Sequence, residues 1–245
     1  MAFDASAPNG RTKSLINIEN DPRIIVWTKL QVPPGEELDT NHWAGYFQPL
    51  VHAVGHDTTV WARVQESPNI IILATLWYTT SELRDFMASP SAQLYRESLA
   101  SGAIVPLVSF ETIYGGARWF NSLARSFTQL FWVYFPAPMT QAQKAEISEL
   151  RGIRPPAMGF SIPQSQVKQR HLPVQLWATQ TEYLHGQEAQ LMLWPHFWRD
   201  AEKAEFRFLG TGYGTVMERF IEELDEVGPL EWKEEIYDFK RLPRL

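Results

Sequence analysis

The stretch Ile70-Ile71-Ile72-Leu73-Ala74-Thr75-Leu76-Trp77-Tyr78-Thr79-Thr80-Ser81-Glu82-Leu83 decides the fold. Residues 70–77 place apolar side chains on both faces of an extended strand, which is typical of a sheet that is covered on each side. Thr79 or Thr80 then offers a helix N-cap, and the helix is predicted to run to Ala88. Ser89-Pro90 restarts it, with serine at the cap and proline in the first turn.

The surrounding sequence predicts one earlier helix and three more strands. Alternation and β-branched residues indicate strands at 23–32 and 105–114, and a hairpin joins 58–65 to 70–77. Asp39-Thr40-Asn41 offers caps for a helix whose apolar spacing continues to Val54. The order is β-α-β-β-α-β, the ferredoxin-like split unit.

The second half of the chain repeats the first in the same order. Trp27 corresponds to Trp132 and Tyr114 to Tyr237, and the offset between partners grows along the chain from 105 to 123 residues. Such growth is expected if one unit was duplicated and its second copy gained loop insertions. The second copy is predicted to hold a helix at 140–150 and strands at 128–135, 174–182, 188–194 and 230–239.

We therefore predict an α+β fold in which two ferredoxin-like β-α-β-β-α-β repeats form an intramolecular, pseudo-dimeric α+β barrel. The expected divisions are a flexible leader at 1–22, a first repeat at 23–116 and a second repeat at 117–245.

The composition excludes several classes of function. The 245 residues include no cysteine, which excludes disulfides and thiolate chemistry, and the net charge of −6 argues against nucleic-acid binding. Met1–Ser14 shows no secretory signal, and the longest apolar run, 70–77, is too short for a membrane span, so a cytoplasmic location is expected. Aromatic residues make up 13% of the chain, ten of them tryptophan, which favours large apolar interiors or an aromatic-walled pocket.

The run Trp77–Leu83, followed by Phe86-Met87, Ser89-Pro90 and Tyr95, resembles the dimeric α+β barrel superfamily, which includes antibiotic-biosynthesis monooxygenase-like and EthD-like proteins. The resemblance covers nearly all of residues 23–240, and it implies two units that pair their sheets back to back. The chain is similar to a fused tandem form, as met in fungal natural-product pathways. The resemblance further implies a cavity between each sheet and its helices, or at the seam of the sheets. Catalytic residues differ between branches, so none is carried over.

The first helices of the two repeats are unequal. In the first repeat, residues 42–50 are aromatic and include Pro49, which opens space in a helix, whereas residues 141–147 read as an ordinary solvated helix. This contrast favours a pocket in the first repeat; the alternative is that the aromatic helix only adds to the hydrophobic core.

The predicted catalytic residues are His42, Tyr46 and Glu111, because histidine and a buried glutamate can transfer protons near neutral pH. The predicted substrate-binding residues are Trp27, Trp43, Phe47, Trp61, Arg63, Trp77, Tyr95 and Tyr114.

Glu111 also has a structural interpretation. It could pair with a basic residue such as Arg63 across strands, and the matching Glu234 in the second repeat favours this. Arg63 and Lys29 lie on strand faces with Trp61 and Trp27, where one of them could clamp a substrate carboxylate.

No cofactor or metal is predicted. His52 and His56 are four residues apart, so on a helix they would share one face and could bind one metal ion. Such a site needs a third ligand, and Asp57 is the only nearby acid; exposed histidines on helices are also commoner than metal ligands. A haem would need a proximal histidine, for which the candidates are His171, His185 and His196. The glycine-rich stretch 210–214 follows a helix-like segment, so it lacks the context of a phosphate loop.

The leading functional hypothesis is a cofactor-independent cyclase or isomerase, including a [4+2] Diels–Alder-type closure, that acts on a hydrophobic secondary-metabolite intermediate. Shape, aromatic walls and one or two donors suffice for such reactions. One alternative is a cofactor-free monooxygenase or decarboxylase of a polyketide-like phenol. Another is a non-catalytic ligand-binding or stress-response module. The expected partner is a hydrophobic small molecule, with neither nucleic acid nor a membrane span, and a homodimer stays open.

Overall fold

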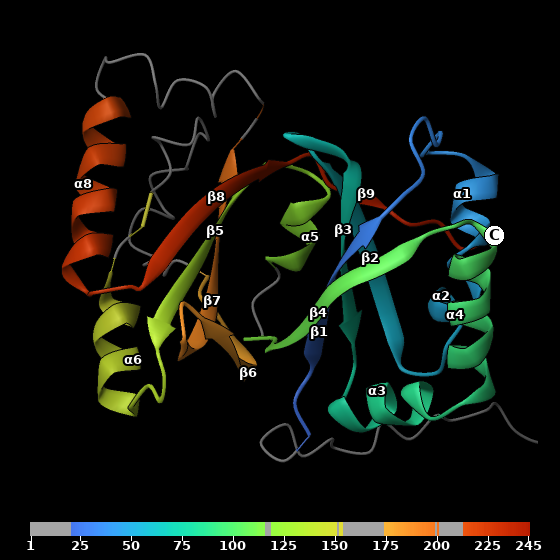
Figure 1. Cartoon of the computed structure of the whole chain (residues 1–245), viewed down its shortest axis with the longest axis horizontal. Helices are drawn as coiled ribbons and strands as arrows, with labels where there is room; N and C mark the ends of the chain where they lie inside the picture. The colour runs from blue at the N-terminus through green and yellow to red at the C-terminus, as the bar shows by residue number, and fades with distance from the viewer. Residues whose placement is uncertain (1–20, 116–118, 151, 154–173, 199, 201–212) are drawn as a thin grey trace, which may run out of the picture.

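The computed structural model describes residues 21–115, 119–150, 152–153, 174–198, 200 and 213–245 (Figure 1). The predicted leader up to residue 20, most of the second-repeat loop, His171 and residues 210–212 of the glycine-rich stretch lie outside them.

The described strands form one curled antiparallel sheet in the order β8-β5-β7-β6-β4-β1-β3-β2-β9. The first half supplies β1 (Ile24–Gln31), β2 (His56–Val64), β3 (Ser67–Trp77) and β4 (Val105–Ile113). The second half supplies β5 (Phe127–Pro136), β6 (Leu176–Leu184), β7 (Gln187–Trp198), β8 (Glu231–Tyr237) and the short β9 (Lys240–Arg241).

Each half places its four long strands in the same spatial order. Counted along the chain within each half, both run fourth, first, third, second, which is the ferredoxin-like arrangement. The halves meet where β4 pairs with β6 at Thr112 and Ala178. Corresponding tryptophans also face alike, since Trp27 and Trp132 point between the two halves whereas Trp77 and Trp194 point towards the helices. This agrees with the repeat, and the duplication itself stays a prediction.

Helices cover the outer faces of both halves (Figure 1). The first half carries α1 (Asn41–Gly45), α2 (Gln48–Val51), α3 (Thr80–Met87) and α4 (Pro90–Ser101). The second carries α6 (Gln141–Glu149) and α8 (Tyr213–Glu226), and the short α5 (Phe120–Leu123) lies between the halves. None of the described helices is long and apolar enough to cross a membrane.

The helix starts follow the capping residues. Thr40 accepts a hydrogen bond from the Trp43 backbone at 3.0 Å, and Thr79 and Ser89 cap α3 and α4 in the same way. The single helix predicted to reach Val54 is instead two short helices. Pro49 lies in the first turn of α2, where its missing N–H costs nothing, so the chain turns and restarts there.

The space between the halves holds the largest apolar cluster of the described residues. It includes Trp27, Trp132 and Tyr237, and it encloses one ion pair in which both Glu235 carboxylate oxygens lie 2.8 Å from Lys29 Nζ. The Lys29 ammonium also lies 4.2 Å from the centre of the Trp132 ring. Burial lowers the pKa of Lys29, and the bond to Glu235 opposes that shift.

Residues 238–245, which we call the C-terminal strap, return from the second half to the first. β9 pairs with β2, and the Leu242 N–H donates to the Thr59 carbonyl at 3.0 Å. The Leu242 side chain is buried beside Trp43 and Trp61. The strap therefore completes a core that belongs mainly to the first half.

Candidate functional site

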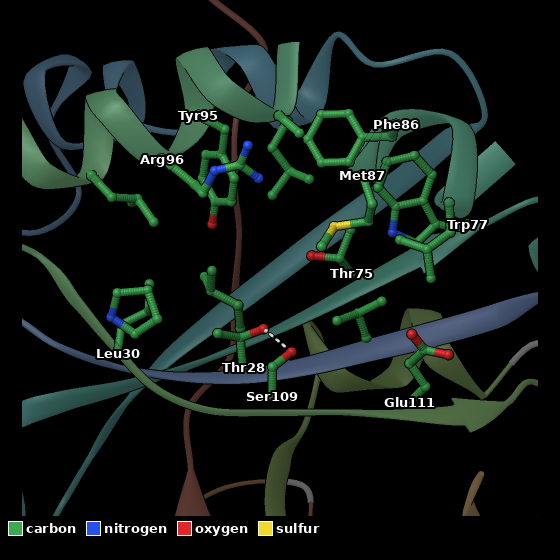
Figure 2. Close-up of a pocket in the computed structure, with 17 residues that line it drawn as sticks. Thr28, Leu30, Thr75, Trp77, Phe86, Met87, Tyr95, Arg96, Ser109 and Glu111 are labelled. Atoms are coloured by element: carbon green, nitrogen blue, oxygen red, sulfur yellow. Dashed lines mark hydrogen bonds between the residues drawn. The ribbon is translucent and has the colours of Figure 1, made fainter. Parts of the chain in front are cut away.

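A cavity of about 220 Å³ lies in the first half, between the outer face of β1, β3 and β4 and the helices α3 and α4 (Figure 2). We call it the α3/α4 pocket. Strand alternation builds its floor, because Val26 and Thr28 of β1 point towards the helices while Trp27 between them points into the space between the halves. Most of the wall is apolar, with Trp77, Phe86 and Leu99 among its members.

Three hydroxyl groups stand on the floor. The Thr28 and Ser109 hydroxyl oxygens lie 3.1 Å apart, and the two residues face each other on neighbouring strands (Figure 2). Thr75, on β3, accepts a hydrogen bond at 3.1 Å from the buried Thr59 hydroxyl. The floor is thus polar at a few fixed points only, as in many small-molecule sites.

The roof contributes a phenol and a guanidinium from adjacent positions of α4. Tyr95 points down towards the floor in Figure 2, and its hydroxyl makes no hydrogen bond to another described residue. Burial raises the pKa of the Tyr95 phenol, so it stays a neutral donor at physiological pH. Arg96 donates to the Gln93 side-chain oxygen, at 2.9 Å through its closer nitrogen, and has no ion pair with a carboxylate of the described chain.

Glu111 is the one carboxylate among the described residues that line this pocket. Both of its oxygens accept from Arg84 of α3, at 2.5 and 2.6 Å, which is the bidentate geometry of a strong charge-assisted pair. The Glu111 side chain is 13% exposed and that of Arg84 is 53% exposed, so the pair bridges the outer edge of the pocket. The expected pairing of Glu111 with Arg63 is wrong: Arg63 donates to the backbone carbonyls of Glu36 and Pro68.

The structure brings three of the sequence-predicted site residues together in this pocket, namely Trp77, Tyr95 and Glu111. The others lie elsewhere. His42 and Tyr46 form an exposed pair with their ring nitrogen and hydroxyl oxygen 2.7 Å apart. The buried core beneath α1 takes up Trp43, Phe47 and Trp61, and the region between the halves holds Trp27 and Tyr114.

Arg96, Thr75 and Ser109 were not singled out from the sequence. A signal existed for Arg96, because it follows Tyr95 on a helix whose buried positions are Ala92 and Leu99. No comparable signal marks the two hydroxyls, since serine and threonine are common on strands with one covered face.

The described histidines do not cluster into a shared metal site. His56 contacts Thr59 and Arg244 instead of the exposed His52, and no group of three potential metal ligands occurs in the described part of the chain. His185 lies exposed in a turn and contacts Glu231. His196 is buried, and a Cβ added to Gly152 would come within 2.9 Å of its Nε2, so that nitrogen has no room for a haem iron.

No protein-family model and no curated protein matches the sequence. Solved structures do match the fold. An anthrone oxidase-like protein aligns with a TM-score of 0.50 and 14% identity over 92% of this chain and 96% of that one. A proposed monooxygenase from Lactobacillus acidophilus aligns with a TM-score of 0.47 and 10% identity over 91% and 95%. A proposed antibiotic biosynthesis monooxygenase from Chloroflexus aurantiacus, at TM-score 0.32 and 19% identity, covers 39% of this chain and 96% of its own.

The first of these likenesses shows the fold and nothing finer. The chain has the ferredoxin-like α+β barrel architecture, with a small, mostly apolar pocket between the sheet and the helices of its first half.

Proposed function

We propose that the chain is a cofactor-independent oxygenase that oxidises a small, electron-rich phenol in the α3/α4 pocket. The observation that carries the proposal is Glu111, the one carboxylate among the described residues of a mostly apolar wall, with the Tyr95 phenol and the Arg96 guanidinium towards the other end of the cavity in Figure 2. A base at one end and two donors at the other suit a substrate that must lose a proton and carry negative charge.

The size of the pocket supports oxidation of a small substrate over cyclisation of a large one. Its volume of about 220 Å³ lies below the ~300–1,000 Å³ of most drug-sized sites, which favours a compact, rigid molecule of no more than three fused rings. A long flexible intermediate, as the predicted cyclase would fold, needs more room. The name of the first similar structure, an anthrone oxidase-like protein, supports trying oxidation before cyclisation or isomerisation.

The proposed reaction balances without a bound redox group. Glu111 removes a proton from the substrate, and the resulting carbanion or phenolate gives one electron to O₂. The substrate radical and superoxide then combine into a carbon–oxygen bond, and the proton held by Glu111 returns to the peroxide anion to give a hydroperoxide. Loss of a second proton from that carbon breaks the O–O bond and releases water, which leaves a carbonyl. One oxygen atom is incorporated, two hydrogens leave the substrate, and the other oxygen becomes water.

The test is oxygen uptake with anthrone and 1-naphthol as probe substrates. We expect one O₂ consumed per product, and a product heavier by one oxygen and lighter by two hydrogens. Glu111→Gln should lower kcat by about 10²–10⁴-fold because it removes the base. Glu97→Gln, an equal change of charge on the exposed side of α4, is the matched control and should leave uptake unchanged.

The other hypotheses predict different results. A product of unchanged mass without oxygen uptake would favour the cyclase or isomerase. Release of CO₂ from an aromatic acid would indicate the decarboxylase, and binding without turnover would indicate a ligand-binding module. Oxygen uptake that is equal in Glu111→Gln and in the unmodified protein would overturn the role of Glu111.

A further inference from the structure

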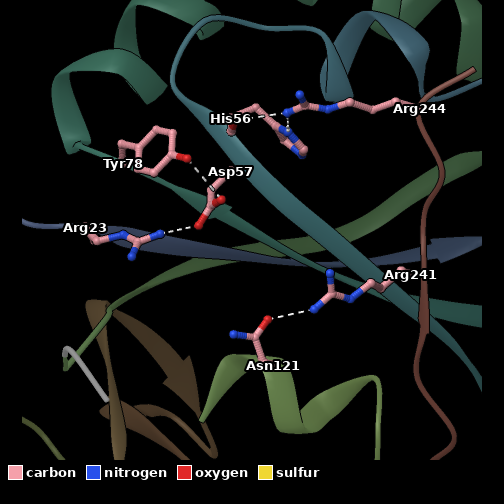
Figure 3. A network of polar contacts seen from close by, with 7 residues as sticks. All are labelled: Arg23, His56, Asp57, Tyr78, Asn121, Arg241 and Arg244. Atoms are coloured by element: carbon pink, nitrogen blue, oxygen red, sulfur yellow. Dashed lines mark hydrogen bonds and ion pairs between the residues drawn. The ribbon is translucent and has the colours of Figure 1, made fainter. Parts of the chain in front are cut away.

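Four residues form a hydrogen-bonded series from the C-terminal strap to the α3/α4 pocket. An Arg244 guanidinium nitrogen lies 3.2 Å from His56 Nδ1, as Figure 3 shows, and His56 Nε2 lies 2.8 Å from the Thr59 hydroxyl. The Thr59 hydroxyl donates to the Thr75 hydroxyl at 3.1 Å. Thr75 lines the pocket, and its side chain is drawn facing the cavity in Figure 2.

The chemistry of the first member fixes the direction of every later bond. A guanidinium can only donate, so His56 Nδ1 must present its lone pair to Arg244. Burial and the Arg244 charge lower the pKa of His56 to about 4, so its ring is neutral at pH 7 and Nε2 carries the proton. That N–H donates to Thr59, whose own proton goes to Thr75.

The last proton in the series is the Thr75 hydroxyl proton. The Thr75 oxygen already accepts from Thr59, and its own proton has no acceptor among the described residues. His56, Thr59 and Thr75 are each 5% exposed or less, so the three polar groups are held in a water-poor wall. Buried polar groups cost free energy unless they are paired, and here the one unpaired donor ends at a cavity.

We propose that Thr75 donates a hydrogen bond to an oxyanion of the bound substrate, and that Arg244, His56 and Thr59 are positioning residues that orient this donor. The proposal rests on the α3/α4 pocket being the site of the proposed function, and it adds a feature of the substrate. The ligand carries a phenolate, enolate or carbonyl oxygen over the C-terminal end of β3. A donor oriented before binding stabilises such charge without the reorganisation that water requires.

Binding of 4-nitrophenol tests the proposal without any turnover, because absorbance distinguishes the phenol from the phenolate. The affinity for each form is measured at a pH below and at a pH above the pKa of 4-nitrophenol. We expect the phenolate to bind more tightly than the phenol. Thr75→Val, which keeps the shape and removes the donor, should weaken phenolate binding about tenfold and phenol binding much less. Thr75→Ser should restore most of the difference.

The positioning role is tested by two variants of the same strap. Arg244→Met should reduce the preference for phenolate in the same direction as Thr75→Val, because His56 is then free to present either ring nitrogen to Thr59. Arg241→Met removes the same charge, but Arg241 donates to Asn121 instead of to the series, so the preference should not change. Urea unfolding of each variant confirms that the binding protein is folded.

Equal weakening of both forms in Thr75→Val would overturn the proposal and show a structural role only. A phenolate preference that survives in Thr75→Val, or no binding of either form to the unmodified protein, would also overturn it. The proposed oxygenase activity fails separately: oxygen uptake would then be absent while the phenolate preference remains.

Discussion

Both ring nitrogens of His196 are buried without a hydrogen-bond partner among the described residues, and the ring packs against Phe131, Trp194 and Phe220. Burial lowers the pKa of His196 to about 3, whereas an unfolded histidine titrates near 6.5. Below pH 6.5 the unfolded chain therefore binds a proton that the folded chain does not, and stability falls as the pH falls towards 3. His56, with a pKa of about 4, adds an effect of the same sign.

We predict that the free energy of unfolding drops between pH 7 and pH 5 by about 2 kcal/mol for each of these two histidines. His196→Leu should remove one of the two contributions, so the free energy of unfolding should change with pH by roughly half as much. Urea unfolding at pH 7, 6 and 5 measures this slope of the free energy of unfolding against pH. His52→Gln, at an exposed position, is the control and should keep the slope of the unmodified protein. An unchanged slope in His196→Leu would contradict the prediction.

Single residues also show why parts of the site could not be predicted from local sequence patterns. Trp43 and Phe47 look like pocket walls in a sequence, yet their rings contact each other at 4.7 Å between centres and fill the core. Whether an aromatic side chain fills a space or borders it depends on the volume that neighbouring elements leave, which no local pattern encodes. The partner of Glu111 was missed for a related reason, since Arg84 comes from the roof instead of a neighbouring strand.

At the scale of elements, the turn before β2 holds the roof of the pocket in place. Gly55 has a φ of +81°, and its carbonyl accepts from the Tyr78 backbone at 2.9 Å. A Cβ at this position would lie 2.3 Å from the Cβ of Glu82, in the first turns of α3. Glycine is thus required here both by the backbone conformation and by close contact with the roof.

Gly35 provides a matched comparison, because its φ is +80° and a Cβ there would meet nothing within 4 Å. We predict that Gly35→Ala costs about 1 kcal/mol of stability, the conformational penalty alone, and that Gly55→Ala costs about 2–4 kcal/mol. Urea unfolding of the two variants measures the difference. Equal costs would mean that α3 moves freely away from the turn.

Elements are also where the sequence was most informative. The predicted strand at 105–114 is β4 at Val105–Ile113, and the Thr79 and Ser89 caps begin α3 and α4 as expected. These features depend on alternation and on capping chemistry, which are local. The helix predicted to reach Val54 failed because a proline in its middle splits it, and a pattern of apolar spacing does not report where the backbone turns.

At the scale of the whole molecule, contacts between distant residues join the halves. The Lys29–Glu235 pair spans 206 positions of sequence, and the C-terminal strap crosses from β8 to β2. Neither contact is visible in a local pattern, because both depend on the curl of the sheet that brings its two ends near each other. The repeat predicted the strand order, whereas these connections come from the closure of the sheet.

We predict that Leu242→Ala destabilises the protein by about 2–4 kcal/mol, since Leu242 is 7% exposed and fills part of the first-half core. Leu245→Ala, three residues on and 56% exposed, should change stability by less than about 0.5 kcal/mol. Urea unfolding compares the two. Similar values would show that the strap lies on the surface without contributing to the core.

The strap also sets an order of events during synthesis. Strand β2, at residues 56–64 and including Trp61, leaves the ribosome early. The segment that pairs with it is made more than a hundred residues later. At the ~5–20 residues per second of translation, the β2 edge waits on the order of 10 s for its partner. During that interval the nascent first half exposes an unpaired strand edge beside Trp61, and such an edge can pair with another chain.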